Sequence, residues 1–140
     1  MSHTSLATFI TKSGISSDLN ILLKAIADAC VDISKAVAEG ALLGTMGSLD
    51  ASNIQGETQK QLDVITNDIF IDHMQRCGQV AGLASEEMED PYAIPVGFKR
   101  GRFLVLFDPL DGSSNVNLNI SVGTIFSVLT CPDHITNPEV

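Results

Sequence analysis

The chain has few basic residues. Eight lysines and arginines stand against seventeen aspartates and glutamates, which gives a net charge of −9. A protein that binds nucleic acid needs clustered lysine and arginine to neutralise the phosphate backbone, and this composition does not supply them. Nucleic acid is therefore excluded as a principal partner. An acidic protein that binds an anionic ligand needs metal ions to reverse the sign of its local field.

Cysteine and histidine are also scarce, and neither is arranged as a binding site. The cysteines are Cys30, Cys77 and Cys131, and the histidines are His3, His73 and His134. Three widely spaced cysteines fit neither a disulfide framework nor the paired spacing of a zinc site, so we expect free thiols in a reducing compartment, the cytoplasm. The histidines show no metal-ligand spacing and are interpreted as surface residues.

Long apolar runs and internal repeats are absent as well. No segment reaches the roughly 18 apolar residues of a membrane span, and no basic segment with a cleavage site opens the chain. We therefore expect neither a membrane partner nor a secretory signal. The hydrophobic residues that are present, 44% of 140, suffice for one core.

Two helices are predicted in the first half of the chain. Apolar residues recur there with helical spacing, at Leu19, Leu22, Leu23, Ile26, Cys30, Ile33 and Val37. Ser16 or Ser17 is predicted to cap the start of this helix, and Gly40 to end it. Residues 40–56, rich in glycine, serine and asparagine, are predicted to be irregular, and residues 58–76 to form the second helix.

Strands are predicted near residues 80–84, 102–107 and 121–130. The continuous apolar run from Phe103 to Phe107 indicates a strand that is buried on both faces. Helices followed by strands predict an α/β fold in which N-terminal helices pack on a mixed β-sheet.

An acidic motif, Asp108-Pro109-Leu110-Asp111, follows that strand directly. Proline suits the second position of a β-turn, so Asp108 and Asp111 are predicted to flank one, with Cα atoms less than ~7 Å apart. Two carboxylates and the exposed carbonyl of Leu110 are hard oxygen ligands of the kind that Mg²⁺ or Mn²⁺ prefers. The alternative is a plain turn that ends a strand, which is commoner for such a motif in isolation.

A potential phosphate site follows the acidic motif. Gly112 lets the backbone approach a ligand closely, and the successive N–H groups of Gly112, Ser113 and Ser114 can cradle an anion. A metal site beside a phosphate site indicates phosphoryl chemistry.

A second acidic cluster, Ser85 to Asp90, follows the apolar stretch 80–84. Adjacent residues of a strand point to opposite faces, so Glu86 and Glu87 can face one site only where the strand has ended. Taken alone, such a cluster is usually a solvated surface turn. Two acidic strand ends together favour a ligand site, because open α/β sheets bind ligands at the carboxyl ends of their strands.

Four segments, in this order, resemble class I fructose-1,6-bisphosphatase. They are Leu62–Asp68, Ser85–Glu87, Phe107–Asn115 and Ser121–Phe126. The resemblance extends from about Ser16 to Thr130. It implies the layered sugar-phosphatase fold, a sugar bisphosphate substrate and a homotetramer. Proteins of that family are considerably longer, so residues 1–140 would be the N-terminal part, regulatory and metal-binding, without the C-terminal sugar-binding part.

The resemblance also implies roles for individual residues. The Mg²⁺ ligands would be Glu86, Asp108, the carbonyl of Leu110 and Asp111, while Asp111, Gly112, Ser113 and Ser114 would bind the sugar 1-phosphate. Asp63 would act with Glu87 to remove a proton from the attacking water. Glu57 occupies the place of a family aspartate, on a mobile loop, that reaches a further metal, although the extra methylene changes its reach.

An AMP site is a trait of some family members. The matching positions here are Ser16, Ser17, Asp18, Leu19, Asn20, Arg102 and Phe103. The animal enzymes have threonine-glycine-glutamate at the first three positions and lysine-tyrosine at the last two. Arg102 can still bind phosphate, but Phe103 lacks the tyrosine hydroxyl and Ser17 replaces a glycine where the backbone approaches closely. These departures argue against regulation by AMP.

Two alternatives stay open at this point. One is another sugar or inositol phosphatase of the same superfamily, in which threonine usually takes the place of Ser113. The other is a non-catalytic metal-binding fragment.

Overall fold

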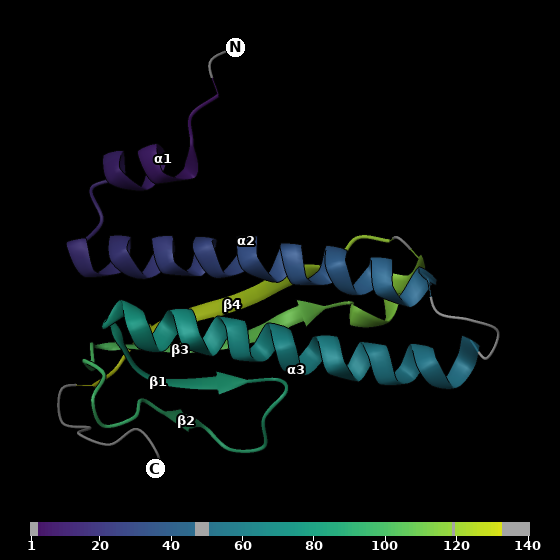
Figure 1. Cartoon of the computed structure of the whole chain (residues 1–140). Coiled ribbons are helices and arrows are strands. Elements are labelled where there is room, and N and C mark those ends of the chain that lie inside the picture. Colours follow the sequence, from purple (N-terminus) through teal and green to yellow (C-terminus); the bar gives the residue numbers. More distant parts are fainter. Residues whose placement is uncertain (1–2, 47–50, 119, 133–140) are drawn as a thin grey trace.

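A computed structural model describes residues 3–46, 51–118 and 120–132, with residues 41–46, 51–59, 117 and 118 described by their backbone alone. Three helices come first: α1 (Leu6–Lys12), α2 (Ser17–Met46) and α3 (Ala51–Cys77). The long helices α2 and α3 lie side by side and antiparallel, and both cover the same face of a sheet (Figure 1). Within the described residues, no helix is both long and apolar enough to cross a membrane.

The sheet has four strands in the order β2-β1-β3-β4. Their bounds are β1 (Val80–Ser85), β2 (Tyr92–Ala93), β3 (Phe103–Asp111) and β4 (Gly123–Thr130), and a short 3₁₀ helix, η1 (Ser113–Leu118), follows β3. β1 and β3 are parallel, whereas β2 and β4 pair antiparallel with their neighbours. The predicted α/β fold, with helices on a mixed sheet, is confirmed, as are the three predicted strands.

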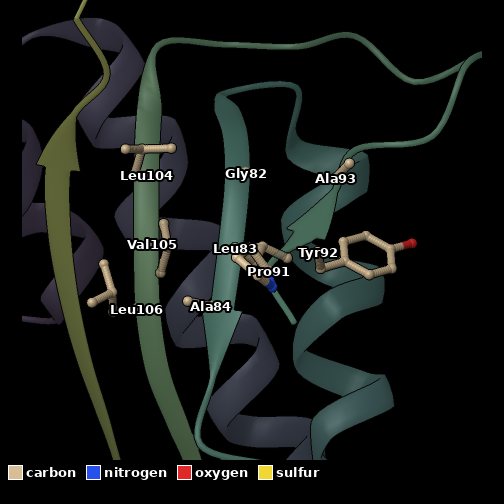
Figure 2. A pocket seen from close by; sticks show the side chains of 9 residues that line it. All are labelled: Gly82, Leu83, Ala84, Pro91, Tyr92, Ala93, Leu104, Val105 and Leu106. Carbon is tan, nitrogen blue, oxygen red and sulfur yellow. The ribbon is translucent and has the colours of Figure 1, made fainter. Parts of the chain in front are cut away.

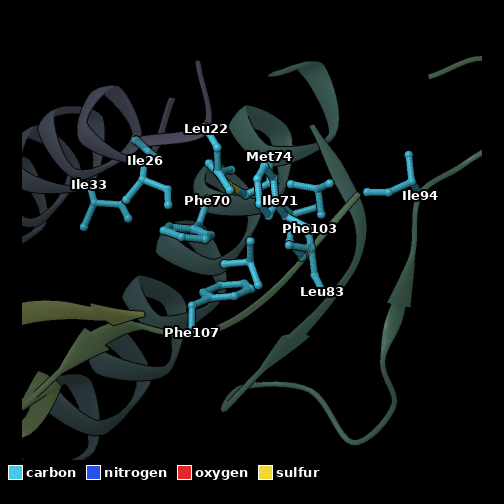
Figure 3. Packing of buried hydrophobic residues seen from close by; sticks show 13 residues of the cluster. Leu22, Ile26, Ile33, Phe70, Ile71, Met74, Leu83, Ile94, Phe103 and Phe107 are labelled. Carbon is cyan, nitrogen blue, oxygen red and sulfur yellow. The ribbon is translucent and has the colours of Figure 1, made fainter. Parts of the chain in front are cut away.

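The core lies between the helix pair and the sheet. Phe70 of α3 stacks on Phe107 of β3, with ring centroids 4.1 Å apart and planes inclined by 18° (Figure 3). Around this pair are Leu22, Ile26, Ala29, Ile33, Ile71, Met74, Val80, Leu83, Ile94, Phe103 and Val105. The predicted apolar face of the first helix is thus the face that packs on the core.

The predicted end of the first helix at Gly40 is wrong. α2 continues through Gly40 to Met46 and α3 begins at Ala51, so most of the predicted irregular segment is helical. The glycine serves close packing instead, because a Cβ at position 40 would lie 2.7 Å from Cδ2 of Leu62 on α3. The predicted cap at Ser16 is confirmed, since its Oγ accepts the N–H of Leu19 at 3.3 Å.

The prediction that β3 is buried on both faces is also wrong for the described residues. Phe103, Val105 and Phe107 are buried toward the helices, whereas Leu106 on the other face is 43% exposed. The helices cover only one face of the sheet. The open face has a shallow cavity of about 170 Å³ over β1 and β3, which Leu104 and Leu106 help to line (Figure 2).

Candidate active site

The two acidic strand ends lie side by side because β1 and β3 are parallel neighbours. Ser85 at the end of β1 pairs with Phe107 of β3, and the N–H of Glu86 donates to the carbonyl of Phe107 at 3.0 Å. Glu86 and Glu87 therefore stand next to Asp108. A cavity of about 410 Å³ opens at this corner of the sheet, and its lining includes Glu86 and Asp108. The prediction that both clusters meet at one place is confirmed.

The segment after Phe107 is a bulged strand and not the predicted β-turn. β3 continues to Asp111, and its pairing with β4 shifts by one residue between Asp108, opposite Ile125, and Asp111, opposite Gly123. A bulge tolerates Pro109, which has no N–H to donate to the ladder. The carboxylate of Asp108 accepts the N–H of Leu110 at 3.0 Å, which fixes its orientation.

Gly112 turns the chain from β3 into η1. Its φ of 78° lies in the left-handed region that favours glycine, and a Cβ there would lie 3.2 Å from Nδ2 of Asn115. The N–H of Asn115 donates to the carbonyl of Gly112 at 2.8 Å and closes the turn. Ser113 and Ser114 then begin η1. That their N–H groups cradle a phosphate stays a prediction.

Asp63 reaches the same corner from α3. Its carboxylate is hydrogen-bonded by Ser113, and its Oδ1 atom is buried without a hydrogen-bond partner among the described residues. Burial raises the pKa of Asp63, the Ser113 hydrogen bond lowers it, and the charge of Glu86 raises it further. The structure thus brings Asp63 together with the strand ends, whereas an ordinary helical carboxylate points into solvent.

The carboxylates of this corner, which we call the acidic corner (Asp63, Glu86, Glu87, Asp108 and Asp111), repel one another. Glu87 is exposed to solvent, but partial burial of its carboxylate raises its pKa to about 7, with further contributions from the charges of Asp63 and Glu86, a hydrogen bond with Glu86, and the charge of Asp108. Burial also raises the pKa of Asp108, the hydrogen bond from Leu110 opposes this, and the charges of Glu86, Asp111 and Asp63 add to it. Among the described residues, no basic group contributes to either shift.

By its chemistry, this donor set fits a hard divalent cation. The side chains supply only carboxylate oxygens, the ligand type that Mg²⁺ and Mn²⁺ prefer, and the buried Oδ1 of Asp63 lacks a partner. In the described part of the chain, however, no three acidic, histidine or cysteine side chains already converge in the geometry of a metal site. Glu57 belongs to α3, but its side chain lies outside the described residues.

Two contributors to this corner escaped the sequence reasoning. Asn67 on α3 is 8% exposed and its Oδ1 accepts a hydrogen bond from the hydroxyl of Ser85 at 2.7 Å. That hydroxyl in turn accepts the N–H of Glu87 at 3.2 Å. The available signal was the spacing of Asn67 from Asp63, which at four positions apart places both residues on one face of a helix.

The residues proposed from the family's AMP site meet at the start of α2. Arg102 donates to Oγ of Ser16 at 3.4 Å and pairs with Asp18 at 3.5 Å, and its guanidinium lies 5.1 Å from the ring centroid of Phe103. Ser17 donates to Asp18 at 3.3 Å. Leu19 and Asn20 continue the first turn of α2, and Asn20 donates its N–H to the carbonyl of Ser16 at 3.0 Å. Binding of AMP here stays untested.

The arrangement of a helix pair on one face of a mixed four-stranded sheet matches the layered α/β fold of a sugar phosphatase, fructose-1,6-bisphosphatase. Residues 5–139 match the family model described as fructose-1-6-bisphosphatase, N-terminal domain, and the chain belongs to this family.

Solved structures of Leishmania major fructose-1,6-bisphosphatase are similar to the chain. The holo form is 34% identical, with a TM-score of 0.78, and the match covers 95% of this chain and 40% of that one. The apo form is 32% identical, with a TM-score of 0.73 and coverage of 95% and 38%. The T-state is 32% identical, with a TM-score of 0.74 and coverage of 96% and 40%. The chain thus spans about two fifths of the length of these proteins.

Proposed function

We propose that this chain is the N-terminal, metal-binding part of an enzyme that hydrolyses fructose 1,6-bisphosphate to fructose 6-phosphate and phosphate. The observation that carries the proposal is the acidic corner, where carboxylates from two parallel strand ends and from α3 meet, with no basic group among them in the part of the chain that the structure describes. Membership of the fructose-1,6-bisphosphatase family and the similarity to the Leishmania enzyme support it.

Glu86, Asp108, the carbonyl of Leu110 and Asp111 would hold Mg²⁺ or Mn²⁺. When bound, the metal polarises the phosphoryl oxygens and lowers the pKa of a water molecule. The backbone of Asp111 to Ser114 would hold the phosphate that is cleaved.

Glu87 and Asp63 would handle the proton of the attacking water. A carboxylate accepts a proton most effectively when its pKa lies near the working pH, and partial burial together with the neighbouring carboxylates raises the pKa of Glu87 to about 7. The hydrogen bond of Asp63 with Ser113 and its interaction with the charge of Glu86 support this role, because Ser113 belongs to the proposed phosphate segment and Glu86 to the proposed metal ligands. No covalent intermediate is required.

The residues that hold the sugar and its second phosphate would come from the longer protein. The family's sugar-binding residues and its last metal-binding glutamate have no counterpart among these 140 residues. We also propose, from the same family resemblance, that the longer protein is a homotetramer in the cytoplasm, where AMP regulation is weak or absent because of the substitutions at Ser17 and Phe103.

The test uses the longer protein that carries this N-terminal part. It should release phosphate from fructose 1,6-bisphosphate in the presence of Mg²⁺ and lose that activity in EDTA, with the product identified as fructose 6-phosphate by mass spectrometry. Equal activity with the chelator would contradict the metal-dependent mechanism. Preference for inositol monophosphate would instead favour the alternative, another phosphatase of the same superfamily.

A further inference from the structure

The acidic segment after β1 is anchored by three backbone N–H groups. The N–H of Glu86 donates to the carbonyl of Phe107 at 3.0 Å, the N–H of Glu87 donates to the hydroxyl of Ser85 at 3.2 Å, and the N–H of Met88 donates to the carbonyl of Ser85 at 3.3 Å. The first bond continues the pairing of β1 with β3, so it is supported by the sheet. The third closes the turn around Glu86 and Glu87 through the backbone alone. The second is the one that depends on a side chain, and a freely rotating hydroxyl would not by itself fix the N–H of Glu87.

Asn67 fixes the orientation of that hydroxyl. Ser85 donates its single hydroxyl proton to Oδ1 of Asn67 at 2.7 Å, which turns its lone pairs toward the N–H of Glu87. Asn67 is 8% exposed, so its carbonyl oxygen is shielded from water and would lose its partner if the hydroxyl were removed. The two bonds form a relay from the buried side of α3 to the backbone of Glu87.

The position of Asn67 on α3 ties this relay to the rest of the acidic corner. Asp63, four residues before Asn67, reaches the corner itself, and Phe70, three residues after Asn67, stacks on Phe107 directly before Asp108 (Figure 3). Residues at these spacings share one face of a helix. One face of α3 therefore contacts both acidic strand ends and contributes a carboxylate of its own.

The hydrogen bonds between Asn67 and Ser85 and between Ser85 and Glu87 oppose the electrostatic repulsion at the acidic corner. Glu86 and Glu87 are exposed, and their charges are close enough to those of Asp63 and Asp108 to repel them. Without these hydrogen bonds, repulsion between like charges would move the Glu86–Glu87 segment away from the acidic corner in the absence of a cation. Groups that hydrogen-bond to metal ligands and orient them commonly change the metal affinity by about 10–100-fold when they are mutated.

We propose that Asn67 and Ser85 are positioning residues, which hold the Glu86–Glu87 segment in place for metal binding at the acidic corner. The inference rests on the proposed function, because it assumes that the corner takes a divalent cation. Neither residue needs to touch the substrate. A purely structural hydrogen bond between α3 and β1 would instead affect the stability of the fold and leave the metal affinity unchanged.

The experiment compares single substitutions in the longer protein. Ser85→Ala removes the hydroxyl and both of its hydrogen bonds, whereas Ser85→Thr retains a hydroxyl. Tyr92→Phe is the matched control, because it removes another hydrogen bond from α3 to the sheet, the 3.0 Å bond from Tyr92 to Gln75, away from the acidic corner. Asn67→Leu tests the other end of the relay, and the Ser85 pair decides the question if Asn67→Leu fails to fold.

Two readouts are independent of catalysis: Mn²⁺ affinity by calorimetry and amide hydrogen exchange of residues 85–90 by mass spectrometry. Ser85→Ala should raise the Kd for Mn²⁺ by about 10–100-fold and speed exchange in this segment, with Ser85→Thr and Tyr92→Phe close to wild type. Equal Mn²⁺ affinity in Ser85→Ala and Tyr92→Phe would overturn the proposal, and so would a wild-type protein that binds no Mn²⁺. If Mn²⁺ binds but fructose 1,6-bisphosphate is not hydrolysed, the proposed function fails while this comparison still decides the positioning role.

Discussion

The pKa of Glu87 shows how the surroundings of a single residue change its acid–base properties. An isolated glutamate is ionised well below neutral pH, but partial burial of the carboxylate and the neighbouring carboxylates raise the pKa of Glu87 to about 7. Burial raises the pKa values of Asp63 and Asp108 in the same direction. The folded protein therefore binds protons more tightly at this corner than the unfolded chain does.

This difference predicts how stability depends on pH. A carboxyl group whose folded pKa is raised stabilises the fold fully below its unfolded pKa, which is 4.5 for Glu87, and loses that contribution as the pH rises through about 7. The metal-free protein should therefore lose stability between about pH 4.5 and pH 7. Because Glu87 is exposed, solvent screening leaves an effect on the order of 1 kcal/mol.

Urea unfolding of metal-free wild type and Glu87→Gln at pH 5 and pH 8 measures this effect. Glu87→Gln should show a smaller loss of unfolding free energy between the two pH values, and saturating Mg²⁺ should reduce the loss in wild type because a cation offsets the repulsion. Identical pH dependence in the two proteins would show that Glu87 titrates as an ordinary surface residue.

The proposed metal ligands give a second prediction at the scale of the residue. Asp111→Asn and Glu86→Gln remove charge without changing volume, and each should lower kcat of the longer protein by at least ~10²-fold because a metal ligand is lost. Steady-state kinetics at saturating Mg²⁺ measure this, with circular dichroism as the control for folding. Wild-type rates in both variants would mean that these carboxylates are surface groups.

At the scale of the element, the contact between α2 and α3 depends on a residue with no side chain. Gly40 lies inside α2, where glycine costs helix stability relative to alanine, by about 1 kcal/mol. In return, the absence of a side chain lets α2 approach α3 closely, because a Cβ at this position would lie 2.7 Å from the buried Leu62 on α3. Close contact between the two helices matters for the site, since α3 carries Asp63 and Asn67.

Gly40→Val should therefore destabilise the protein, by about 1–3 kcal/mol, because overpacking outweighs the gain in helix propensity. Combining it with Leu62→Ala should make the two losses less than additive, since the smaller residue makes room for the valine. Chemical denaturation of both single variants and the double variant measures the coupling. Strictly additive losses would show that the two side chains do not meet.

At the scale of the whole molecule, the acidic corner is one part of a larger site. The chain spans 38–40% of the length of the matched Leishmania structures. Its sheet is covered on one face only, and Ile125 and Leu129 of β4 are 57% and 50% exposed. The four proposed oxygen ligands form an incomplete shell for Mg²⁺, which prefers about six.

The 140-residue chain by itself should consequently be inactive. Without residues that hold the second phosphate, the substrate is not oriented, and orientation lowers a barrier by up to ~7–11 kcal/mol in the best cases. A phosphate-release assay with fructose 1,6-bisphosphate across a Mg²⁺ titration should show no release above buffer. Robust Mg²⁺-dependent turnover would show that the missing residues are not required.

The sequence by itself determined the buried face of α2, the presence of three of the four strands and the neighbourhood of the acidic residues. The helical spacing of Leu22, Ile26 and Ile33 predicted the buried face of α2, because the period of a helix is a local property of the chain. The acidic residues after β1 and those at the end of β3 could be placed together for a similar reason. Parallel strands that are neighbours bring their carboxyl ends to one edge, so local patterns and a general rule of topology were sufficient.

Only the tertiary structure decided how those elements meet. From the sequence, Gly40 is predicted to end a helix, and only its contact with Leu62 of α3 explains why a glycine lies inside α2. Leu106 is predicted to be buried, and only the placement of the helices on one face of the sheet explains its exposure. Asn67 and Ser85 are 18 positions apart, and no local pattern predicts their hydrogen bond. Burial, close approach and hydrogen bonds between distant segments depend on three-dimensional packing, whereas periodicity and turn chemistry depend on a few neighbouring residues.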